Sequence, residues 1–496
     1  MNIEQRLVAI AQEYLLHPPS GDDPVVDFAG PDELRAAFDA VIPLELSDDT
    51  VPRSAAEVAA AAELVVKHSV HTSHPRFFNQ NFAGPDPVAV AGDWLGAALN
   101  TTNATYEAAP VFTLMEAAVL RKLARVAGYP IGDAPDGLPP GLFAPGGSSA
   151  TLYAMQLARH RLDPDLVNRG AGPERLVLFV SDTGHYAAVK SAALLGLGRD
   201  AVIKVPTDAE GVIDITALRV AIAAAIDRGD TPFLVIATAG TTVTSAFDPL
   251  DELADVCADH DLWLHVDGCY GGSALFSERQ RHRLAGVERS DSFVWNLHKM
   301  MGVTQQCTAL LVADPELLGP CFATGADYLF QPDKLHGELD SGDRHFQCAR
   351  RVDVLKLWLL WQARGDAGFA TRIDHAVAMA DHLRATIDGS AGMFATLAPG
   401  SYTNVVFTWV PPELRPANGP FVADDLTEAD RQRLHGLAPR IKARMQRDGR
   451  ALLGYQPVHG LNCFRFLFIN DAVTTEDIDV TLADIARYGA EEWAIR

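Results

Sequence analysis

Residues 232–267 read PFLVIATAGTTVTSAFDPLDELADVCADHDLWLHVD, and this stretch decides the fold class. It opens and closes with short apolar runs (232–240 and 262–267) that are rich in Val, Leu and Ile. The segment between them has helical spacing. Its apolar residues that share one face are Leu250, Leu253, Ala254 and Cys257. Near-continuous apolar runs that alternate with a helix predict parallel strands buried on both faces.

Further apolar runs of the same kind flank this stretch, at 175–181, 292–296 and 307–314. Several of them are separated by helix-compatible segments, so the middle of the chain predicts an α/β fold on a mostly parallel sheet. Ligands on such sheets bind outside the carboxyl ends of the strands. Candidate functional residues are therefore expected directly after each run.

The two ends of the chain have a different character. The N-terminal part predicts helices, including the alanine-rich AAEVAAAAELVVKH. The C-terminal part mixes helical patterns with the strand-like segments TNVVFTWV and CFRFLFIN. The sequence therefore predicts a helical N-terminal segment (1–73), a large cofactor-binding domain (74–355) and a small C-terminal α+β domain (356–496).

Composition limits the partners and the compartment. The chain has 496 residues, 48% of them hydrophobic, and its 41 basic and 64 acidic residues give a net charge of −23. This balance argues against nucleic acid or an anionic membrane as the main partner. No apolar run reaches the roughly 20 residues that span a bilayer, and the N-terminus does not read as a signal peptide. We therefore expect a cytoplasmic protein with no membrane partner.

The six cysteines are scattered along the chain and form no C-x-x-C pair. In a long cytoplasmic chain this pattern predicts reduced, mostly buried thiols. We expect neither disulfides nor a metal site.

A glycine turn lies in FAPGGSSATLYAM (143–155), where Gly146 and Gly147 precede Ser148 and Ser149 at the start of a helix-compatible run. Backbone N–H groups at a helix start, unobstructed by side chains, suit a phosphate. A plain turn explains the same residues, so the pattern needs support from other parts of the chain.

Three ionisable residues follow other strand ends. His185 lies just past the run 175–181, Asp267 ends LHVD, and Lys299 ends SFVWNLHK. Taken singly, they are also explained as a structural histidine, a helix cap or ion pair, and a surface lysine. Together with the glycine turn they match one small molecule, pyridoxal 5′-phosphate. It has a phosphate for the turn, a ring face for the imidazole, a pyridine nitrogen for the carboxylate and an aldehyde for the amine.

Longer stretches extend this pattern along the chain. They are HPRFFNQ (74–80), TYEAAPVFTLME (105–116), PGG (145–147), ATAGTTV with AFDPL (237–250), LHVD, HKMMGV with QC, YLFQPDK (328–334), RVDVLKLWLLW (351–361), APRIKARM (438–445) and GYQP (454–457). With them the sequence resembles the pyridoxal-phosphate group II amino-acid decarboxylases. It is most similar to the branch that holds the animal-type glutamate, cysteine sulfinate and aspartate decarboxylases.

The resemblance implies roles for single residues. Lys299 matches the lysine that binds the cofactor covalently, Asp267 the partner of the ring nitrogen, and His185 the base stacked on the ring. The positions that match cofactor-holding residues are Gly147, Ser148, Ser149, Thr242, Asn296 and His298. The positions that match the substrate pocket are Gln80, Thr102, Ala104 and Arg465. Tyr328 matches the tyrosine of a mobile catalytic loop, which reaches an active site shared with the partner subunit.

The implied fold is pyridoxal-phosphate fold type I, like that of aspartate aminotransferase, with a mostly parallel seven-stranded central sheet. The implied assembly is a homodimer. The implied reaction is the α-decarboxylation of an L-amino acid to its amine and CO₂, with Tyr328 as the candidate acid that protonates the α-carbon.

The chain departs from the family pattern near the site. Leu297 stands where proline is usual, and Gly268 and Cys269 replace a pair of alanines, with Gly268 expected to leave more room near the ring. Ala104 stands where the glutamate and cysteine sulfinate branches carry an aromatic residue. The lost ring predicts either a bulkier substrate or a neighbouring side chain that refills the gap.

Arg465 favours a substrate with an acidic side chain, because a guanidinium binds a carboxylate or sulfinate fork; a structural ion pair is the alternative. The leading hypothesis is therefore decarboxylation of glutamate, aspartate or cysteine sulfinate. The runner-up is a decarboxylase of a larger or non-acidic amino acid, such as 2,4-diaminobutyrate, valine or an aromatic one. More distant alternatives are an aminotransferase or aldehyde-forming enzyme on the same fold, and a non-catalytic regulator, which the intact site residues oppose.

Overall fold

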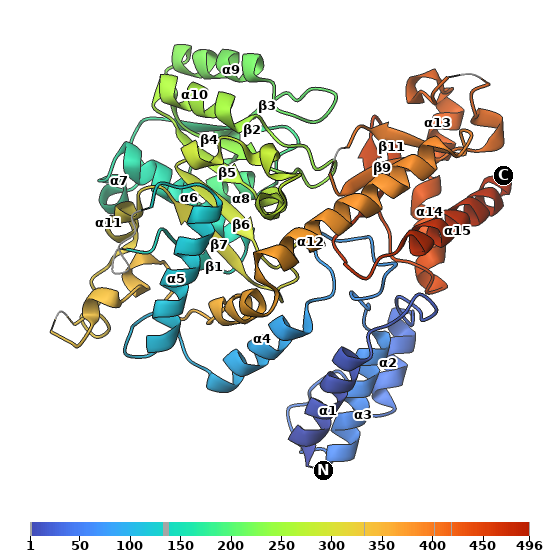
Figure 1. Cartoon of the computed structure of the whole chain (residues 1–496), viewed down its shortest axis with the longest axis horizontal. Coiled ribbons are helices and arrows are strands. Elements are labelled where there is room, and N and C mark those ends of the chain that lie inside the picture. The colour runs from blue at the N-terminus through green and yellow to red at the C-terminus, as the bar shows by residue number, and fades with distance from the viewer. Residues whose placement is uncertain (1, 132–137, 332, 401, 418, 496) are drawn as a thin grey trace. The chain divides into compact units, whose positions relative to one another are not determined.

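The computed structural model describes residues 2–131, 138–331, 333–400, 402–417 and 419–495 (Figure 1). The chain forms two compact units. The large-sheet unit comprises residues 85–375 and 399–402, and the small-sheet unit comprises residues 1–84, 376–398 and 403–496. The three-part division expected from the sequence, at 73/74 and 355/356, stays a prediction.

The large-sheet unit contains a seven-stranded sheet, counted over the described residues, in the order β1-β7-β6-β5-β4-β2-β3. Its strands are β1 (Gly141–Ala144), β2 (Leu176–Ser181), β3 (Val202–Val205), β4 (Thr231–Thr238), β5 (Trp263–Asp267), β6 (Ser292–Asn296) and β7 (Thr308–Val312). Strands β3, β2, β4, β5 and β6 pair in parallel, and β7 is antiparallel to both β6 and β1. The predicted mostly parallel sheet is therefore confirmed, and the carboxyl ends of β1, β2, β4, β5 and β6 share one edge.

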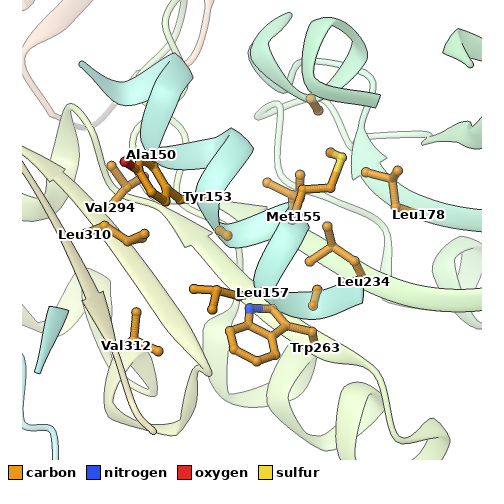
Figure 2. Close-up of a cluster of buried hydrophobic side chains, with 14 of the residues drawn as sticks. Ala150, Tyr153, Met155, Leu157, Leu178, Leu234, Trp263, Val294, Leu310 and Val312 are labelled. Carbon is orange, nitrogen blue, oxygen red and sulfur yellow. The ribbon is translucent and has the colours of Figure 1, made fainter. Parts of the chain in front are cut away.

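Both faces of this sheet are covered, which explains the near-continuous apolar runs. Leu178 and Leu234 pack in a buried cluster with Tyr153 and Leu157 of α6 (Gly147–Leu162) (Figure 2). The alternate residues of the same strands, such as Phe179, are buried as well. On α10 (Leu250–His260), the residues predicted to share one face are all buried.

Further helices complete the large-sheet unit. They are α4 (Pro87–Leu99), α5 (Pro110–Val126), α7 (Leu166–Arg169), α8 (Ala187–Leu194), α9 (Ile215–Asp227) and α11 (Leu318–Phe322). The long α12 (Val354–Asp388) belongs to this unit up to residue 375 and to the small-sheet unit from residue 376. It is interrupted at Gly365, whose φ of 66° lies in the left-handed region that favours glycine.

The small-sheet unit contains an antiparallel sheet in the order β10-β11-β9-β8. Its strands are β8 (Phe394–Ala398), β9 (Asn404–Trp409), β10 (Gly454–Val458) and β11 (Leu461–Leu467), and its helices are α1 (Ile3–Leu16), α2 (Pro31–Asp39), α3 (Ala55–His68), α13 (Glu428–His435), α14 (Leu437–Arg447) and α15 (Thr475–Ala494). The predicted strand TNVVFTWV contains β9, and β11 begins two residues before CFRFLFIN and overlaps its first part. The alanine-rich segment is α3, which begins with a capping box: the Glu57 N–H donates to the Ser54 hydroxyl at 3.2 Å, and the Ser54 N–H donates to the Glu57 carboxylate at 2.8 Å.

Within the described ranges, no helix has both the length and the apolar character needed to cross a bilayer. The six cysteines are free thiols; Cys348 is exposed and the others are buried.

Candidate active site

Candidate residues from several segments meet at the carboxyl edge of the large sheet. Gly147 follows β1, His185 follows β2, Asp267 ends β5 and Asn296 ends β6. Lys299 lies in the turn after β6, where its backbone N–H donates to the Asn296 carbonyl at 3.1 Å. The shared edge brings together residues that lie up to about 150 positions apart in the sequence, as the strand pattern predicted.

The start of α6 is open to an anion. Gly146 is the N-cap residue, with a φ of 130°, and it makes no side-chain capping hydrogen bond to the first turn. That turn carries Ser148 and Ser149. A methyl group on Gly147 would overlap the Cys269 sulfur and lie 3.2 Å from the Asn296 amide nitrogen, so the close packing at this position requires glycine. The exposed N–H groups and the helix dipole suit a phosphate.

Asp267 interacts with Lys299, His185 and Cys269. Enclosure by protein disfavours its charged form, but the charges of Lys299 and His185 and the hydrogen bonds from Cys269 outweigh it and hold the pKa of Asp267 below its usual range. One of these bonds runs from the Cys269 N–H to Asp267 Oδ1, at 3.1 Å. A carboxylate that stays ionised inside a site can hold a proton on a ligand nitrogen.

His185 presents a neutral imidazole. Burial lowers its pKa, as does the nearby charge of Lys299, while the charge of Asp267 opposes this shift. The Ala187 N–H donates to His185 Nδ1 at 3.2 Å, so the neutral ring carries its proton on Nε2. The arrangement provides a flat, uncharged ring beside Asp267 and Lys299.

Two more polar side chains, one at the end of β6 and one just after it, are held by the first residue of β7 and the residue before it. The Thr308 hydroxyl donates to Asn296 Oδ1 at 2.9 Å, which leaves the amide NH₂ as a donor toward the start of α6. His298 Nδ1 lies 2.8 Å from the Cys307 carbonyl oxygen and 3.0 Å from the Cys307 backbone nitrogen, so this residue fixes the orientation of the ring. Burial lowers the pKa of His298 to about 4, so its ring is neutral at pH 7.

The remaining predicted residues of this unit lie on loops. Thr242 is half-buried in the loop after β4. The ring of Tyr328, in the loop after α11, is 76% exposed. The segment before α5 holds Thr102, whose hydroxyl accepts the Arg350 N–H at 2.9 Å, and Ala104, whose carbonyl accepts the Gly342 N–H at 2.8 Å. Thr102 and Ala104, which are predicted to line the substrate pocket, are thus hydrogen-bonded to the stretch that follows the Tyr328 loop.

Gln80 and Arg465 belong to the small-sheet unit. Arg465 lies in β11, and its Nη2 donates to the Asn79 carbonyl at 3.0 Å. Gln80 is the next residue and is exposed. One backbone segment therefore holds both members of the predicted substrate pair.

Sequence reasoning missed a buried ion pair behind these loops. Arg350 Nη1 donates to Glu116 Oε1 at 3.0 Å, and the Asn103 amide donates to Glu116 Oε2 at 2.5 Å. Arg350 also donates to the Ser341 hydroxyl at 3.0 Å and to the Phe143 carbonyl of β1 at 3.4 Å. The network links the segment before α5 and the stretch after the Tyr328 loop to the strand that leads into α6. The sequence offered one indication of these two residues. Glu116 is the last residue of one stretch that resembles the decarboxylase family, and Arg350 directly precedes another.

The structure also accounts for departures from the family pattern. Leu297 is fully buried, so it acts as a core residue. The expectation that Gly268 leaves free room is wrong, because a methyl group there would overlap the Phe293 ring, which already fills the space. Near Ala104, the space beside Gly342 is bounded by the Phe330 ring and the Ala104 carbonyl. Phe330 is therefore the neighbouring side chain that could refill the gap.

Comparison with known proteins agrees with this chemistry. The conserved domain of pyridoxal-dependent decarboxylases matches residues 38–410. The cysteine sulfinic acid decarboxylase of Homo sapiens is 43% identical over 487 residues, which cover 97% of this chain and 94% of that protein. The acidic amino acid decarboxylase GADL1 of Bos taurus is 41% identical over 495 residues, which cover 99% of this chain and 91% of that protein. The crystal structure of mouse CSAD matches with a TM-score of 0.91 at 41% identity, covering 98% of each chain.

Proposed function

The chain belongs to the family of pyridoxal-dependent decarboxylases and is an amino-acid decarboxylase that uses pyridoxal 5′-phosphate, and we propose that its substrate is an acidic L-amino acid: glutamate, aspartate or cysteine sulfinate. The observation that carries this choice is the 41–43% identity, over nearly the whole chain, to relatives that act on cysteine sulfinic acid and acidic amino acids. Arg465 supports it, because a guanidinium pairs well with a carboxylate or sulfinate.

Three residues are proposed to hold the reacting end of the cofactor. Lys299 binds it covalently, Asp267 keeps its ring nitrogen protonated, and His185 stacks on its ring. The depressed pKa of Asp267, caused by Lys299, His185 and Cys269 against the effect of burial, supports an ionised carboxylate at that position. The neutral ring of His185 suits stacking.

The phosphate is proposed to bind at the start of α6. The residues assigned to it are Gly147, Ser148, Ser149, Asn296 and His298, with Thr242 positioning the cofactor from the loop after β4. The N-cap residue Gly146, which makes no side-chain hydrogen bond, and the absence of a side chain on Gly147 support this assignment, because a phosphate needs close approach to backbone N–H groups.

When bound, pyridoxal 5′-phosphate supplies an electron sink for the bond between the α-carbon and the carboxylate. Asp267 keeps a proton on the ring nitrogen throughout, which maintains the capacity of that sink. Tyr328 is proposed to deliver a proton to the substrate α-carbon once CO₂ has left. The loop that carries Tyr328 would exclude water and direct the proton to that carbon instead of a position that yields a carbonyl by-product.

The proposed substrate contacts are Arg465 and Gln80 for the acidic end, with Thr102 and Ala104 lining the pocket. The Phe330 ring near Ala104 supports a pocket that remains suited to a small acidic substrate. The runner-up is a decarboxylase of a larger or non-acidic amino acid. It is favoured by Ala104 itself, since a lost aromatic ring enlarges a pocket unless Phe330 compensates for it.

The protein is proposed to act as a cytoplasmic homodimer with shared active sites. The exposed ring of Tyr328 supports the shared site, because it is accessible to a second subunit. The six free thiols, all but one of them buried, agree with a reducing compartment.

The test is CO₂ release by the purified, cofactor-loaded protein from glutamate, aspartate, cysteine sulfinate, 2,4-diaminobutyrate, valine and tyrosine. We expect release from at least one acidic substrate, and none from any substrate with the Lys299→Ala variant. Release from the non-acidic substrates alone would establish the runner-up. A carbonyl product without CO₂ would identify an aminotransferase.

A further inference from the structure

Cys269 and Gly268 form a tight turn directly after Asp267. The Cys269 N–H donates to Asp267 Oδ1 at 3.1 Å, and the Cys269 thiol lies within hydrogen-bonding reach of the same carboxylate. One residue therefore supplies Asp267 with two donors, in addition to the positive charge of Lys299.

The turn is held rigidly. The Gly268 N–H lies 3.1 Å from two strand carbonyls, and a methyl group on Gly268 would overlap the Phe293 ring. Glycine lets the chain bend closely against Phe293, and this bend places the side chain of Cys269. That side chain is 8% exposed, and its sulfur fills the space beside Gly147 at the start of α6.

The thiol is suited to donate. Burial and the negative charge of Asp267 raise the pKa of Cys269 well above its usual range, so the group keeps its proton. Under the proposed function Lys299 is bound covalently to the cofactor. Cys269 has no such bond and remains next to Asp267. In this chain, cysteine stands where the family usually has an alanine, which has no side-chain donor.

We propose that Cys269 is a positioning residue for the decarboxylation: its N–H and S–H hold the Asp267 carboxylate in one orientation, and its sulfur couples that carboxylate to Gly147 at the phosphate end of the site. This inference rests on the proposed role of Asp267 as partner of the ring nitrogen. A cysteine that only filled space would respond alike to alanine and serine, whereas a donor is replaced by serine and not by alanine.

The first test is the S–H stretching band in infrared spectra of the cofactor-free protein, which does not depend on activity. Subtracting the spectrum of Cys269→Ala from that of the wild type isolates the band of Cys269. We expect the Asp267→Asn substitution to move this band to higher frequency, because a neutral amide accepts a weaker hydrogen bond than a carboxylate. The band of Cys257, another buried thiol, isolated in the same way, should not move. An unmoved Cys269 band would overturn the proposal.

The second test is the dissociation constant of pyridoxal 5′-phosphate, with thermal unfolding as the check on folding. Loss of one hydrogen bond predicts roughly three- to tenfold weaker binding for Cys269→Ala and binding within about twofold of the wild type for Cys269→Ser. Equal constants for the two variants would refute the donor role. If Cys269→Ala does not fold, the difference spectrum between wild type and Asp267→Asn still decides, because an S–H band must move in it. The two proposals can fail separately. If the Cys269 S–H band shifts in Asp267→Asn but the wild type releases no CO₂ from any acidic substrate, the proposed substrate class is refuted and the hydrogen bond is supported.

Discussion

Replacing Gly147 with alanine should weaken cofactor binding, because the new methyl group has no space. It would overlap the Cys269 sulfur and lie 3.2 and 3.3 Å from the polar atoms of the Asn296 amide. The first turn of α6 must then move and take with it the N–H groups proposed to bind the phosphate. Overpacking of this kind costs about 1–3 kcal/mol. If the cost appears in binding, the dissociation constant of the cofactor rises roughly 5- to 150-fold.

The assay is a titration of cofactor-free protein with pyridoxal 5′-phosphate, followed by absorbance, with thermal unfolding measured alongside. Gly319→Ala is the matched control, because a methyl group on Gly319 of α11 meets no atom within 4 Å. Combining Gly147→Ala with Cys269→Ala removes the overlapping sulfur. The effect of the double variant on the free energy of cofactor binding should therefore differ from the sum of the two single effects by about 0.5–3 kcal/mol. Wild-type affinity in Gly147→Ala, or strict additivity in the double variant, would refute the reasoning.

Three further predictions test other parts of the molecule. Tyr328→Phe removes the proposed proton donor and should shift products from the amine toward the carbonyl compound, as measured by mass spectrometry; an unchanged amine yield would rule out this role. Glu116→Gln removes one charge of a pair whose side chains are 3% and 7% exposed and should lower the free energy of unfolding by about 3–5 kcal/mol. Asp366 pairs with Lys122, and these two side chains are 54% and 42% exposed, so Asp366→Asn should change the free energy of unfolding by less than about 1 kcal/mol. Similar denaturant midpoints for Glu116→Gln and Asp366→Asn would contradict this difference. Stability should fall as the pH drops from about 6.5 toward 4, because burial lowers the pKa of His265 and His298 to about 4 while the unfolded chain takes up protons near 6.5. His298→Gln should flatten this decline in denaturant midpoint, and an unchanged slope would disprove the assignment.

Patterns between near neighbours were predictable from the sequence. Helix α3 and the buried face of α10 follow from spacing along a single segment, and the strands follow from apolar runs bounded by polar residues. The placement of His185, Asp267 and Lys299 at one edge was predictable too, because parallel strands present their carboxyl ends on the same side of a sheet. The roles of these residues remain proposals.

Contacts between distant segments were not predictable. Glu116 and Arg350 are 234 positions apart, and nothing in either local pattern indicates that they pair. Gly268 was read as leaving room, yet Phe293 from the neighbouring strand fills that room. The complete burial of Leu297 is likewise not indicated by its neighbours in the sequence.

The sequence by itself determined the strand–helix alternation, the sheet edge at which the candidate residues gather and the residue types suited to pyridoxal 5′-phosphate. Only the tertiary structure decided which side chains pack closely against which glycines: Cys269 against Gly147, Phe293 against Gly268 and Phe330 against Gly342. The physical reason is that periodicity and turn chemistry act over a few residues, whereas close packing is set by atoms brought together from far along the chain.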